Sequence, residues 1–457
     1  MDPQPALLLT ALRRRGVGRA ADLAAELGIS QPTLSRLVRS LQGRVIVIGK
    51  ARRTRYAVVR NVRGLQADVP VFRVDVNGRP RRCATLRMLD PEGAYLEFAA
   101  QMGWPLDDTM RDGLFPGLPY FIADARPQGF LGRAFAREHG PRLNVPIDPT
   151  RWSDDDVLVA LALAGEDVPG DLIVGEASLE SFQRRRAEGL PAIPAAARER
   201  TYPRRAAAAL LGEAPGSSAG GEFAKFTAAV GGKNGIRHVI VKFSPADDAP
   251  ASTRWRDLLV AEHHAAAALA RAGVPAVHSE LVYANGRTFL EVTRFDRAGA
   301  YGRRAVVSLA SVEPALLGLG EVRWERAATG LSRRGWLSSE DAQRVAVLAL
   351  FGELIGNTDM HPGNLAFLQA GEGGFALAPA YDMLPMLFAP ARSGELVARR
   401  LTPGPPSPEY EAEWRTALAA ASDYWQAVAH DGRASDAFRR ICADNVIRVR
   451  EIGERLG

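Results

Sequence analysis

The chain contains very little cysteine and no long apolar run. Cys83 and Cys442 are the two cysteines among 457 residues. Because they lie far apart in the sequence, neither a disulfide framework nor a cysteine zinc site is indicated. The absence of a stretch of about 18 apolar residues argues against a membrane-spanning helix. The first residues, MDPQPALLLTALRRRG, carry most of their charge after the apolar stretch, which is not typical of a secretory signal. We therefore expect a cytoplasmic protein with no membrane partner.

Positive charge is concentrated at the N-terminus. The net charge is +6, and residues 1–60 hold twelve Lys/Arg against three Asp/Glu, a balance of +9. The rest of the chain therefore carries −3. This asymmetry indicates a polyanionic partner for the first segment only.

The segment GRAADLAAELGISQPTLSRLVRSL predicts two short helices joined by a turn. Gly28 is placed to end the first helix, Ser30 to cap the second, and Pro32 to lie in its first turn. Such a pair is typical of a helix-turn-helix. The following RVIVIGKARRTRYAVV has two strand-like runs around a basic tip, as in a wing. We predict a winged helix-turn-helix domain at residues 1–62.

The predicted domain offers polar side chains suited to duplex DNA. Candidates for contacts with base edges and phosphates in the major groove are Gln31, Thr33, Ser35, Arg36 and Arg39. Candidates for phosphate contacts from the wing are Lys50, Arg52, Arg53 and Arg55. The alternative is a small helical interaction domain with a solvated basic face. We favour DNA binding, and because such domains commonly act as dimers we expect a homodimer.

Five polar features follow one another in the second half of the chain. A Gly/Ser loop, GSSAGGEFAKFTAAV, precedes a strand with Lys242 in RHVIVKFSP, and a helix with Glu262 comes next. The segment LIGNTDMHPGNLAFL contains Asp359 and Asn364 in D-x-x-x-x-N spacing, and a short apolar strand then leads to Asp382. This is the order and spacing that protein kinases use.

Phosphoryl transfer explains why these residue types are needed. One carboxylate orients and partly deprotonates the attacking hydroxyl, while an amide oxygen and a second carboxylate hold Mg²⁺ against the phosphates. A lysine neutralises phosphate charge, and a Gly/Ser loop presents backbone N–H groups to it. The sequence therefore predicts a kinase-like fold that uses ATP and Mg²⁺.

These motifs resemble the HipA family of serine/threonine kinases, the toxins of bacterial toxin–antitoxin pairs. SSAGGEFAKFT is similar to the family's S-x-A-G-x-x-x-K loop, with one extra residue, and LEVTRFDR is similar to its V-x-R-F-D-R hinge. LIGNTDMHPGNLAF and LAPAYDMLP resemble its L-I-G-N-x-D-x-H-x-x-N and L-x-P-x-Y-D-x-L motifs. The attached helix-turn-helix makes the chain similar to the YjjJ-type members, in which DNA binding is fused to the kinase.

The resemblance implies a role for each matching residue. Asp359 would be the catalytic base, Asn364 and Asp382 the Mg²⁺ ligands, and Lys242 the phosphate-binding lysine. Other ATP contacts fall on Gly220, Thr293, Phe295, His361 and Asn364, with Lys225 and Glu262 in support. Ser217 or Ser218 would be autophosphorylated. A protein serine or threonine would be the substrate, with an aminoacyl-tRNA synthetase as one possibility implied by the family.

These expectations amount to an α+β multidomain protein. We predict the winged helix-turn-helix at 1–62, a HipA-like N-terminal subdomain at 70–195, an ATP-binding region at 196–298 and an all-α catalytic lobe at 299–457. Two alternatives stay open. DMHPGN is also close to a motif of aminoglycoside and choline phosphotransferases, which act on small molecules. The kinase-like part could instead be a non-catalytic sensor body of a transcription regulator.

Overall fold

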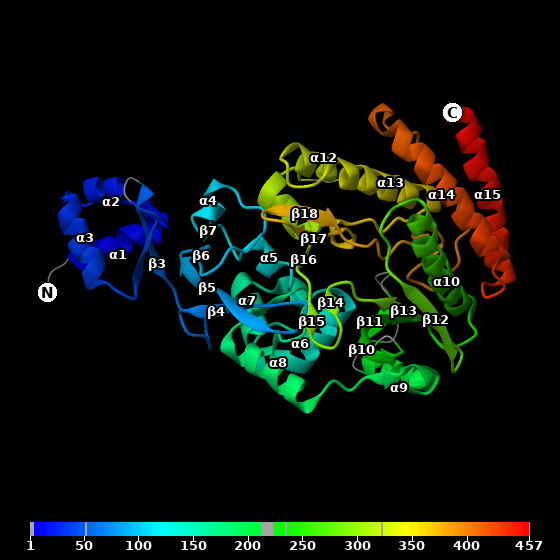
Figure 1. Ribbon diagram of the computed structural model, residues 1–457, viewed down its shortest axis with the longest axis horizontal. Coiled ribbons are helices and arrows are strands. Elements are labelled where there is room, and N and C mark those ends of the chain that lie inside the picture. Colours follow the sequence, from blue (N-terminus) through cyan, green and yellow to red (C-terminus); the bar gives the residue numbers. More distant parts are fainter. Residues whose placement is uncertain (1–3, 51–52, 212–222, 234, 321–322, 457) are drawn as a thin grey trace.

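The structure, a computed structural model, describes residues 4–50, 53–211, 223–233, 235–320 and 323–456. The predicted positions Arg52, Ser217, Ser218 and Gly220 lie outside these residues. The molecule is elongated, with the N-terminal helices at one end and the C-terminal helices at the other (Figure 1). In the described ranges, every helix is too short or too polar to cross a membrane.

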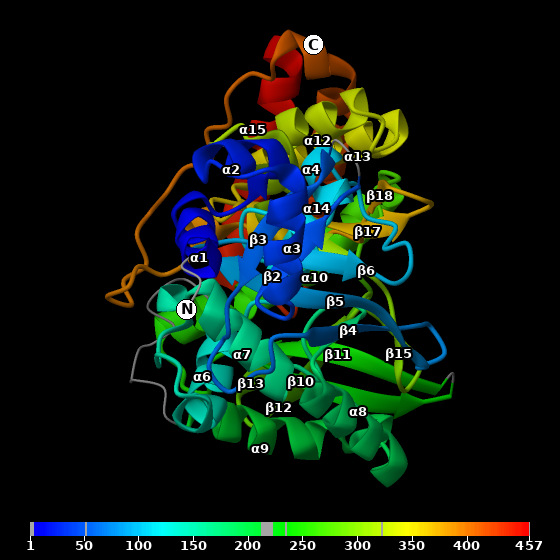
Figure 2. The ribbon, with the colours of Figure 1, turned by 90° about the vertical axis from the view of Figure 1, so that its left-hand side faces the viewer.

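The N-terminal unit combines three helices with three short strands. Its elements are α1 (Gln4–Arg15), β1 (Gly18–Arg19), α2 (Ala20–Glu26), α3 (Gln31–Ser40), β2 (Val45–Ile48) and β3 (Arg55–Val59). As expected, Gly28 follows α2 with a φ of 64°, and the Ser30 side chain accepts a hydrogen bond of 3.3 Å from the Thr33 N–H. Leu12, Leu23 and Leu34, one from each helix, are fully buried together. The helices face the viewer in Figure 2.

The N-terminal unit shares a sheet with the middle of the chain. The eight strands run β1-β3-β5-β4-β8, with β2 on β3, β6 on β5 and β7 on β6. Val58 and Val59 of β3 pair with Asp90 and Leu89 of β5. The N-terminal unit is therefore continuous with the structure behind it.

The middle region packs short helices against this sheet. Its elements are β4 (Val69–Val74), β5 (Pro80–Asp90), β6 (Ala94–Phe98), α4 (Asp108–Arg111), β7 (Leu114–Phe115), α5 (Tyr120–Ala123), α6 (Gly129–Leu143), α7 (Asp154–Ala164), β8 (Leu172–Val174) and α8 (Glu176–Glu188). A hairpin turn at Asn77-Gly78 joins β4 to β5, and Gly78 has a φ of 76°. Arg60 donates two hydrogen bonds of 2.6 Å to Asp155 at the start of α7.

A second sheet of five strands, in the order β12-β13-β11-β10-β9, follows. Its elements are β9 (Ile193–Pro194), α9 (Arg198–Leu210), β10 (Ala224–Gly232), β11 (Gly235–Phe243), α10 (Pro250–Arg271), β12 (Ser279–Ala284) and β13 (Arg287–Thr293). The two faces of the sheet pack against different helices. Phe289 lies in the cluster with Tyr202 of α9, whereas Leu290 lies with Leu258 of α10.

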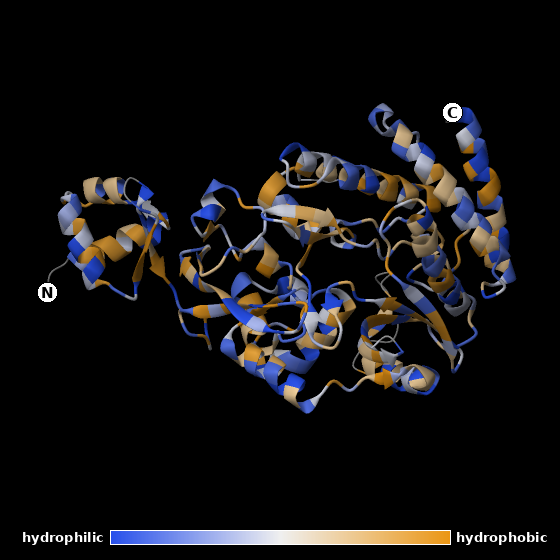
Figure 3. Cartoon of the chain, viewed as in Figure 1, coloured by the Kyte–Doolittle hydropathy of each residue, from blue (hydrophilic) through white to orange (hydrophobic). Residues whose placement is uncertain are grey.

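The C-terminal part is mainly helical but contains strands. Two short strands, β14 (Arg297–Ala298) and β15 (Gly302–Arg303), lead into β16 (Val306–Ser308), α11 (Leu309–Val312), α12 (Trp324–Arg333), α13 (Ser339–Ile355), β17 (Ala366–Ala370), β18 (Gly374–Leu377), α14 (Glu411–His430) and α15 (Asp436–Leu456). Hydrophobic and hydrophilic residues alternate along α15 (Figure 3). The prediction of an all-α lobe is wrong, because β16, β17 and β18 form an antiparallel sheet. The runs of β16 and β17 are too short to be distinguished from helix or loop by periodicity, whereas β18 lies within the short apolar strand predicted before Asp382.

Candidate active site

Strand alternation explains where Lys242 points. Val241 and Phe243 on β11 are buried in the cluster that faces α9. Because successive side chains on a strand point to opposite faces, Lys242 faces α10. Lys225 is its direct partner on β10, so both lysines lie on the same face of the sheet.

Lys242 joins two carboxylates from distant parts of the chain. Its Nζ donates hydrogen bonds of 2.6 and 2.8 Å to the two carboxylate oxygens of Glu262 on α10. It also donates to Oδ1 of Asp382. The Lys242 and Glu262 side chains are 7% and 6% exposed, whereas that of Asp382 is 27% exposed. Asp382 is therefore the member of the triad with a solvent-facing edge.

Electrostatics favour the charged forms of Lys242 and Asp382 in this triad, whereas burial raises the pKa of the Glu262 carboxyl. Burial opposes the charged form of Lys242, but Asp382 and Glu262 outweigh it and raise the pKa of the ammonium group. Burial likewise opposes ionisation of Asp382, whereas Lys242 and Lys225 lower its carboxyl pKa. A charged lysine and a charged aspartate are thus held side by side at neutral pH, which suits a phosphate and a divalent cation respectively.

The backbone at Asp382 is unusual. Its φ of 58° lies in the left-handed region, which a residue with a side chain rarely adopts outside tight turns and functional sites. The neighbouring Tyr381 hydroxyl donates a hydrogen bond of 2.7 Å to the carbonyl of Gly363. The segment that carries Asp382 is therefore tied directly to the segment that carries Asp359 and Asn364.

The helix α13 ends where the segment with the predicted catalytic residues begins. The Ser338 side chain caps its N-terminus by accepting from the Asp341 N–H at 3.0 Å. Gly356 follows its last residue with a φ of 71°, and the Asn357 N–H then donates 2.8 Å back to the carbonyl of Gly352. This glycine-dependent ending redirects the chain toward the sheet containing Lys242.

Hydrogen bonds within residues 357–364 fix the loop. Asn357 Oδ1 accepts from the Asp359 N–H at 3.1 Å, and the Asn364 amide nitrogen donates 2.9 Å to the carbonyl of Asp359. The Gly363 N–H donates 3.1 Å to Nδ1 of His361. Asp359 and His361 are exposed, whereas Asn364 is buried. The loop thus presents the Asp359 carboxylate to solvent on a bonded frame.

The donor set fits magnesium. Asp382 offers a carboxylate, and Asn364 offers its amide oxygen because its amide nitrogen is already committed to the Asp359 carbonyl. Oxygen ligands of this kind are those Mg²⁺ prefers, and it usually takes one or two carboxylates together with substrate phosphates. In the described ranges, His, Cys, Asp and Glu form no cluster of three that could hold a metal by themselves. A Mg²⁺ held by Asp382 and Asn364 would complete its coordination with oxygens of water or of the substrate phosphates.

The predicted adenine-binding hinge begins at the end of β13. The Thr293 N–H donates 2.9 Å to the carbonyl of His278, and the Arg294 N–H donates 2.8 Å to that of His238. Phe295 comes next, and its ring lies 5.8 Å from that of Tyr381. The backbone N–H groups of Thr293 and Arg294 thus both donate to carbonyls within the protein. Within the part of the chain that the structure describes, no backbone carbonyl accepts from the N–H of Phe295.

The residues expected to bind DNA differ in their surroundings. On α3, Gln31, Arg36 and Arg39 are exposed, whereas Thr33 and Ser35 are half-buried. Arg36 donates 3.3 Å to the Thr33 hydroxyl. In the predicted wing, Lys50 and Arg53 are exposed. Arg55 is different, because it donates 2.9 Å to Asp112 of the middle region and is therefore committed to an ion pair within the protein.

Two contributors to the site were missed by sequence reasoning. Asn357 links both halves of the site, because besides accepting from Asp359 it donates 3.4 Å to the carbonyl of Asp382. Tyr381 provides the second link, through Gly363. Asn357 lies two residues before Asp359, and Tyr381 lies directly before Asp382, which was the signal for them available in the sequence. Only the fold shows that they bridge the two segments.

Comparison with known proteins identifies the family of the chain. The "YjjJ-like toxin, middle domain" family matches residues 65–183, and the "HipA-like C-terminal domain" family matches residues 217–448. Toxin YjjJ of Escherichia coli (strain K12) is 39% identical over 450 residues, which cover 98% of each chain. The chain belongs to the HipA family, in its YjjJ-type branch.

Solved structures related to this YjjJ-type chain are more distant. HipA of Shewanella oneidensis MR-1, solved with HipB and its operator DNA, is 13% identical, covers 83% of this chain and 94% of its own, and has a TM-score of 0.45. The Helicobacter pylori proinflammatory kinase CtkA is 11% identical, covers 49% of this chain and 90% of its own, and has a TM-score of 0.35.

Proposed function

We propose that this HipA-family chain is an ATP- and Mg²⁺-dependent serine/threonine-protein kinase with a DNA-binding domain fused at its N-terminus. The observation that carries the proposal is the hydrogen-bonded triad of Lys242, Glu262 and Asp382 beside the loop with Asp359 and Asn364. Kinases need this lysine–glutamate pair and this metal-binding aspartate in place before transfer can occur.

Each side chain has a definite task in the proposed reaction. Asp359, exposed at the tip of its loop, accepts the proton of the substrate hydroxyl and orients its oxygen toward the phosphorus. Lys242 neutralises phosphate charge, and Glu262 holds the ammonium group in position. Asn364 and Asp382 would hold Mg²⁺, which would supply positive charge to offset that of the phosphates during transfer. Orientation of the nucleotide falls to the hinge near Phe295.

Incubation with γ-labelled ATP tests the proposal. Wild type should transfer label to protein only when Mg²⁺ is present, and Asp359→Asn should reduce transfer by about 10²–10⁴-fold because a general base is lost. Thr358→Val, which changes the exposed neighbour instead, is the control. Absence of transfer and of ATP binding by wild type would favour the alternative of a non-catalytic sensor body.

The identity of the labelled product separates protein kinases from small-molecule kinases. We propose autophosphorylation at Ser217 or Ser218, on the basis of sequence resemblance alone, since both lie outside the described residues. Mass spectrometry should find phosphoserine there in wild type and not in Asp359→Asn. Comparing the phosphoproteomes of cells that express the two proteins would identify the substrate, with aminoacyl-tRNA synthetases among the candidates.

A specific observation favours DNA binding as a second function. Three side chains of α3, Gln31, Arg36 and Arg39, are exposed on one helix, and Lys50 and Arg53 are exposed on the adjacent wing. This pattern suits a recognition helix in the major groove with phosphate contacts from the wing. We propose that the unit is a winged helix-turn-helix and that the protein binds DNA as a homodimer. A gel-shift titration with its own upstream DNA and with random duplex tests this.

A further inference from the structure

The segment that follows β13 is held by a buried ion network. Asp296 is 6% exposed. It accepts hydrogen bonds from Nε and Nη2 of Arg294 at 3.0 and 2.9 Å, from Arg297 Nη1 at 2.6 Å and from the Gly170 N–H at 3.1 Å. Burial opposes ionisation of Asp296, but the two arginines outweigh it and lower its pKa. The carboxylate is therefore charged and fully engaged.

Arg297 carries the network into the middle region. Its Nη2 donates 3.0 Å to the carboxylate of Asp167 and 2.7 Å to the carbonyl of Val168, and its Nη1 donates 3.2 Å to the carbonyl of Gly170. The Arg297 side chain is 3% exposed. These acceptors all belong to residues 166–171, the loop between α7 and β8. The loop is thus wrapped around one guanidinium group from the hinge.

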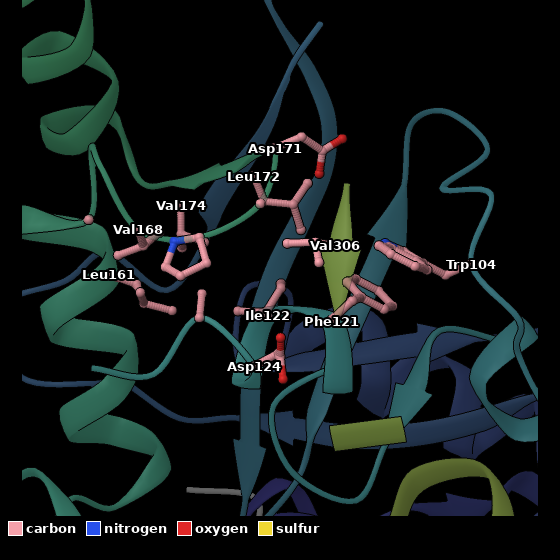
Figure 4. A pocket seen from close by; sticks show the side chains of 14 residues that line it. Trp104, Phe121, Ile122, Asp124, Leu161, Val168, Asp171, Leu172, Val174 and Val306 are labelled. Carbon is pink, nitrogen blue, oxygen red and sulfur yellow. The ribbon is translucent and has the colours of Figure 1, made fainter. Parts of the chain in front are cut away.

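The same loop is fixed on its other side. Val168 and Leu172 line a pocket together with Val306 of β16 (Figure 4). The carboxylate of Asp171 lies 2.8 Å from Nε of Arg73 on β4. Because β8 begins at Leu172 and pairs with β4, a shift of the loop would disturb the sheet edge. The sheet of the middle region therefore determines where the loop holds Arg297.

Phe295 is the residue whose position depends on this network. It lies between Arg294 and Asp296, and its ring contacts that of Tyr381, which precedes the proposed metal ligand Asp382. Both neighbours of Phe295 are held by charge-assisted hydrogen bonds, which are stronger and more directional than neutral ones. The backbone at Phe295 thus has little freedom to shift relative to the catalytic site.

We propose that Arg294, Asp296, Arg297 and residues 166–171 form a hinge clamp that positions Phe295 for the nucleotide. The middle region thereby acts as a positioning element for ATP, a role distinct from catalysis and from DNA binding. The inference rests on the proposed kinase function. Phe295 is the residue that would touch the nucleotide, and Asp167, Asp296 and Arg297 are positioning residues that act through it.

Asp167→Asn in the full-length protein tests the clamp. The Asp167 side chain is 45% exposed, so the amide is tolerated sterically while the charge paired with Arg297 is lost. The matched control is Asp155→Asn, which makes the same chemical change in the ion pair with Arg60. Asp155 lies at the other end of α7 from the loop, about 15 Å away along an 11-residue helix. Both variants should show wild-type circular dichroism.

Three measurements are made on each protein. Calorimetric binding of ATP with Mg²⁺ and steady-state phosphorylation give Kd, KM and kcat, and hydrogen exchange of residues 293–298 without nucleotide reports on the hinge itself. We expect Asp167→Asn to raise Kd and KM for ATP about three- to tenfold with kcat within about twofold, because a charge-assisted bond is lost remote from the reacting atoms. Exchange at the hinge should accelerate. Asp155→Asn should match wild type in all of them.

The contrary outcomes are distinct. Wild type that binds ATP, with Asp167→Asn unchanged in affinity and exchange, overturns the clamp and leaves the proposed kinase intact. The same holds if Asp167→Asn lowers kcat alone, or if Asp155→Asn produces equal effects. Wild type that binds no ATP at millimolar concentration overturns the proposed function, and the clamp as a nucleotide-positioning element with it.

Discussion

Lys242 and Asp382 form a hydrogen-bonded ion pair although 140 residues separate them in the sequence. One comes from the central strand of the five-stranded sheet, and the other follows the antiparallel sheet of the C-terminal part. The pair therefore brings the lysine proposed to bind phosphate and the aspartate proposed to bind Mg²⁺ to the junction of the two sheets. Because Asp382 is more exposed than its partners, a cation with phosphate could enter between the two charges without unburying Glu262.

Replacement of the lysine should make stability depend on pH in the reverse sense to wild type. In wild type the pKa of Asp382 is lower in the folded than in the unfolded protein, which stabilises the fold at neutral pH. This stabilisation is lost as the pH falls and Asp382 becomes protonated. In Lys242→Met, Glu262 and Asp382 repel, and at least one carboxyl pKa rises. A carboxyl group whose pKa is raised by folding stabilises the folded state at low pH, and this stabilisation is lost as the pH increases. We expect a deficit in unfolding free energy of about 1–3 kcal/mol near pH 8 that shrinks near pH 5.

Urea unfolding at the two pH values measures this deficit. Lys233→Met, at an exposed lysine in the turn between β10 and β11, is the matched control and should show no deficit at either pH. An equal deficit for Lys242→Met at both values would mean that repulsion between the two carboxylates is not its source. Phosphoryl transfer should be lost in Lys242→Met and retained in the control.

Tyr381→Phe should separate loop geometry from nucleotide binding. The change removes the hydrogen bond of 2.7 Å to the Gly363 carbonyl but keeps the ring that packs against Phe295. We expect a loss of about 1 kcal/mol in stability, as for a neutral hydrogen bond, and a several-fold lower kcat with little change in KM for ATP. A raised KM with unchanged kcat would show that Tyr381 acts on the hinge rather than on the catalytic loop.

Local patterns predicted much of the catalytic geometry. Lys242 could be assigned to a strand and Glu262 to a helix because each lies in an unambiguous apolar pattern, and their pairing follows from the order of motifs. The cap at Ser30 and the glycine ending at Gly28 were predicted for the same reason and are confirmed. In these places the decisive interactions span few residues or follow a recurring motif order.

Contacts between distant segments could not be predicted. The sequence marks Arg55 as one more basic residue of the wing, and only the shared sheet reveals Asp112 as its partner. The hinge motif suggests nucleotide contact, whereas its two arginines and its aspartate form ion pairs with one another and with Asp167. The strands β16 and β17 were missed because each has at most five residues and gains stability from its neighbours rather than from its own propensity. By contrast, β18 lies within the short apolar strand that the sequence predicts before Asp382.

Loss of the proposed metal ligands should abolish transfer by different routes. Asp382→Asn removes the carboxylate charge but leaves the Lys242–Glu262 pair intact, so folding should be preserved. Asn364→Ala removes a possible ligand and also the hydrogen bond to the Asp359 carbonyl. We therefore expect Asn364→Ala to cost about 1 kcal/mol more in stability. If ATP still binds to both variants but elevated Mg²⁺ restores phosphoryl transfer in neither, the loss of activity lies in the chemical step. Wild-type turnover in either variant would refute the assignment of the replaced residue as a metal ligand.

Salt-dependent DNA binding should distinguish the wing residues from one another. Removing one contact between a basic side chain and a phosphate reduces the magnitude of the slope of log K against log salt concentration by about 1. In full-length protein, Lys50→Ala and Arg53→Ala should each weaken binding to every duplex and make this slope shallower, because both side chains are exposed. Arg55→Ala should leave the slope unchanged, since Arg55 is paired with Asp112.

Arg36→Ala and Arg39→Ala should instead reduce discrimination between sequences, by about 1–3 kcal/mol for a base contact. Gel-shift titrations at two salt concentrations test all five variants. A slope change for Arg55→Ala equal to that of Arg53→Ala would show that DNA displaces Asp112, and an unchanged slope for every wing variant would refute the phosphate contacts.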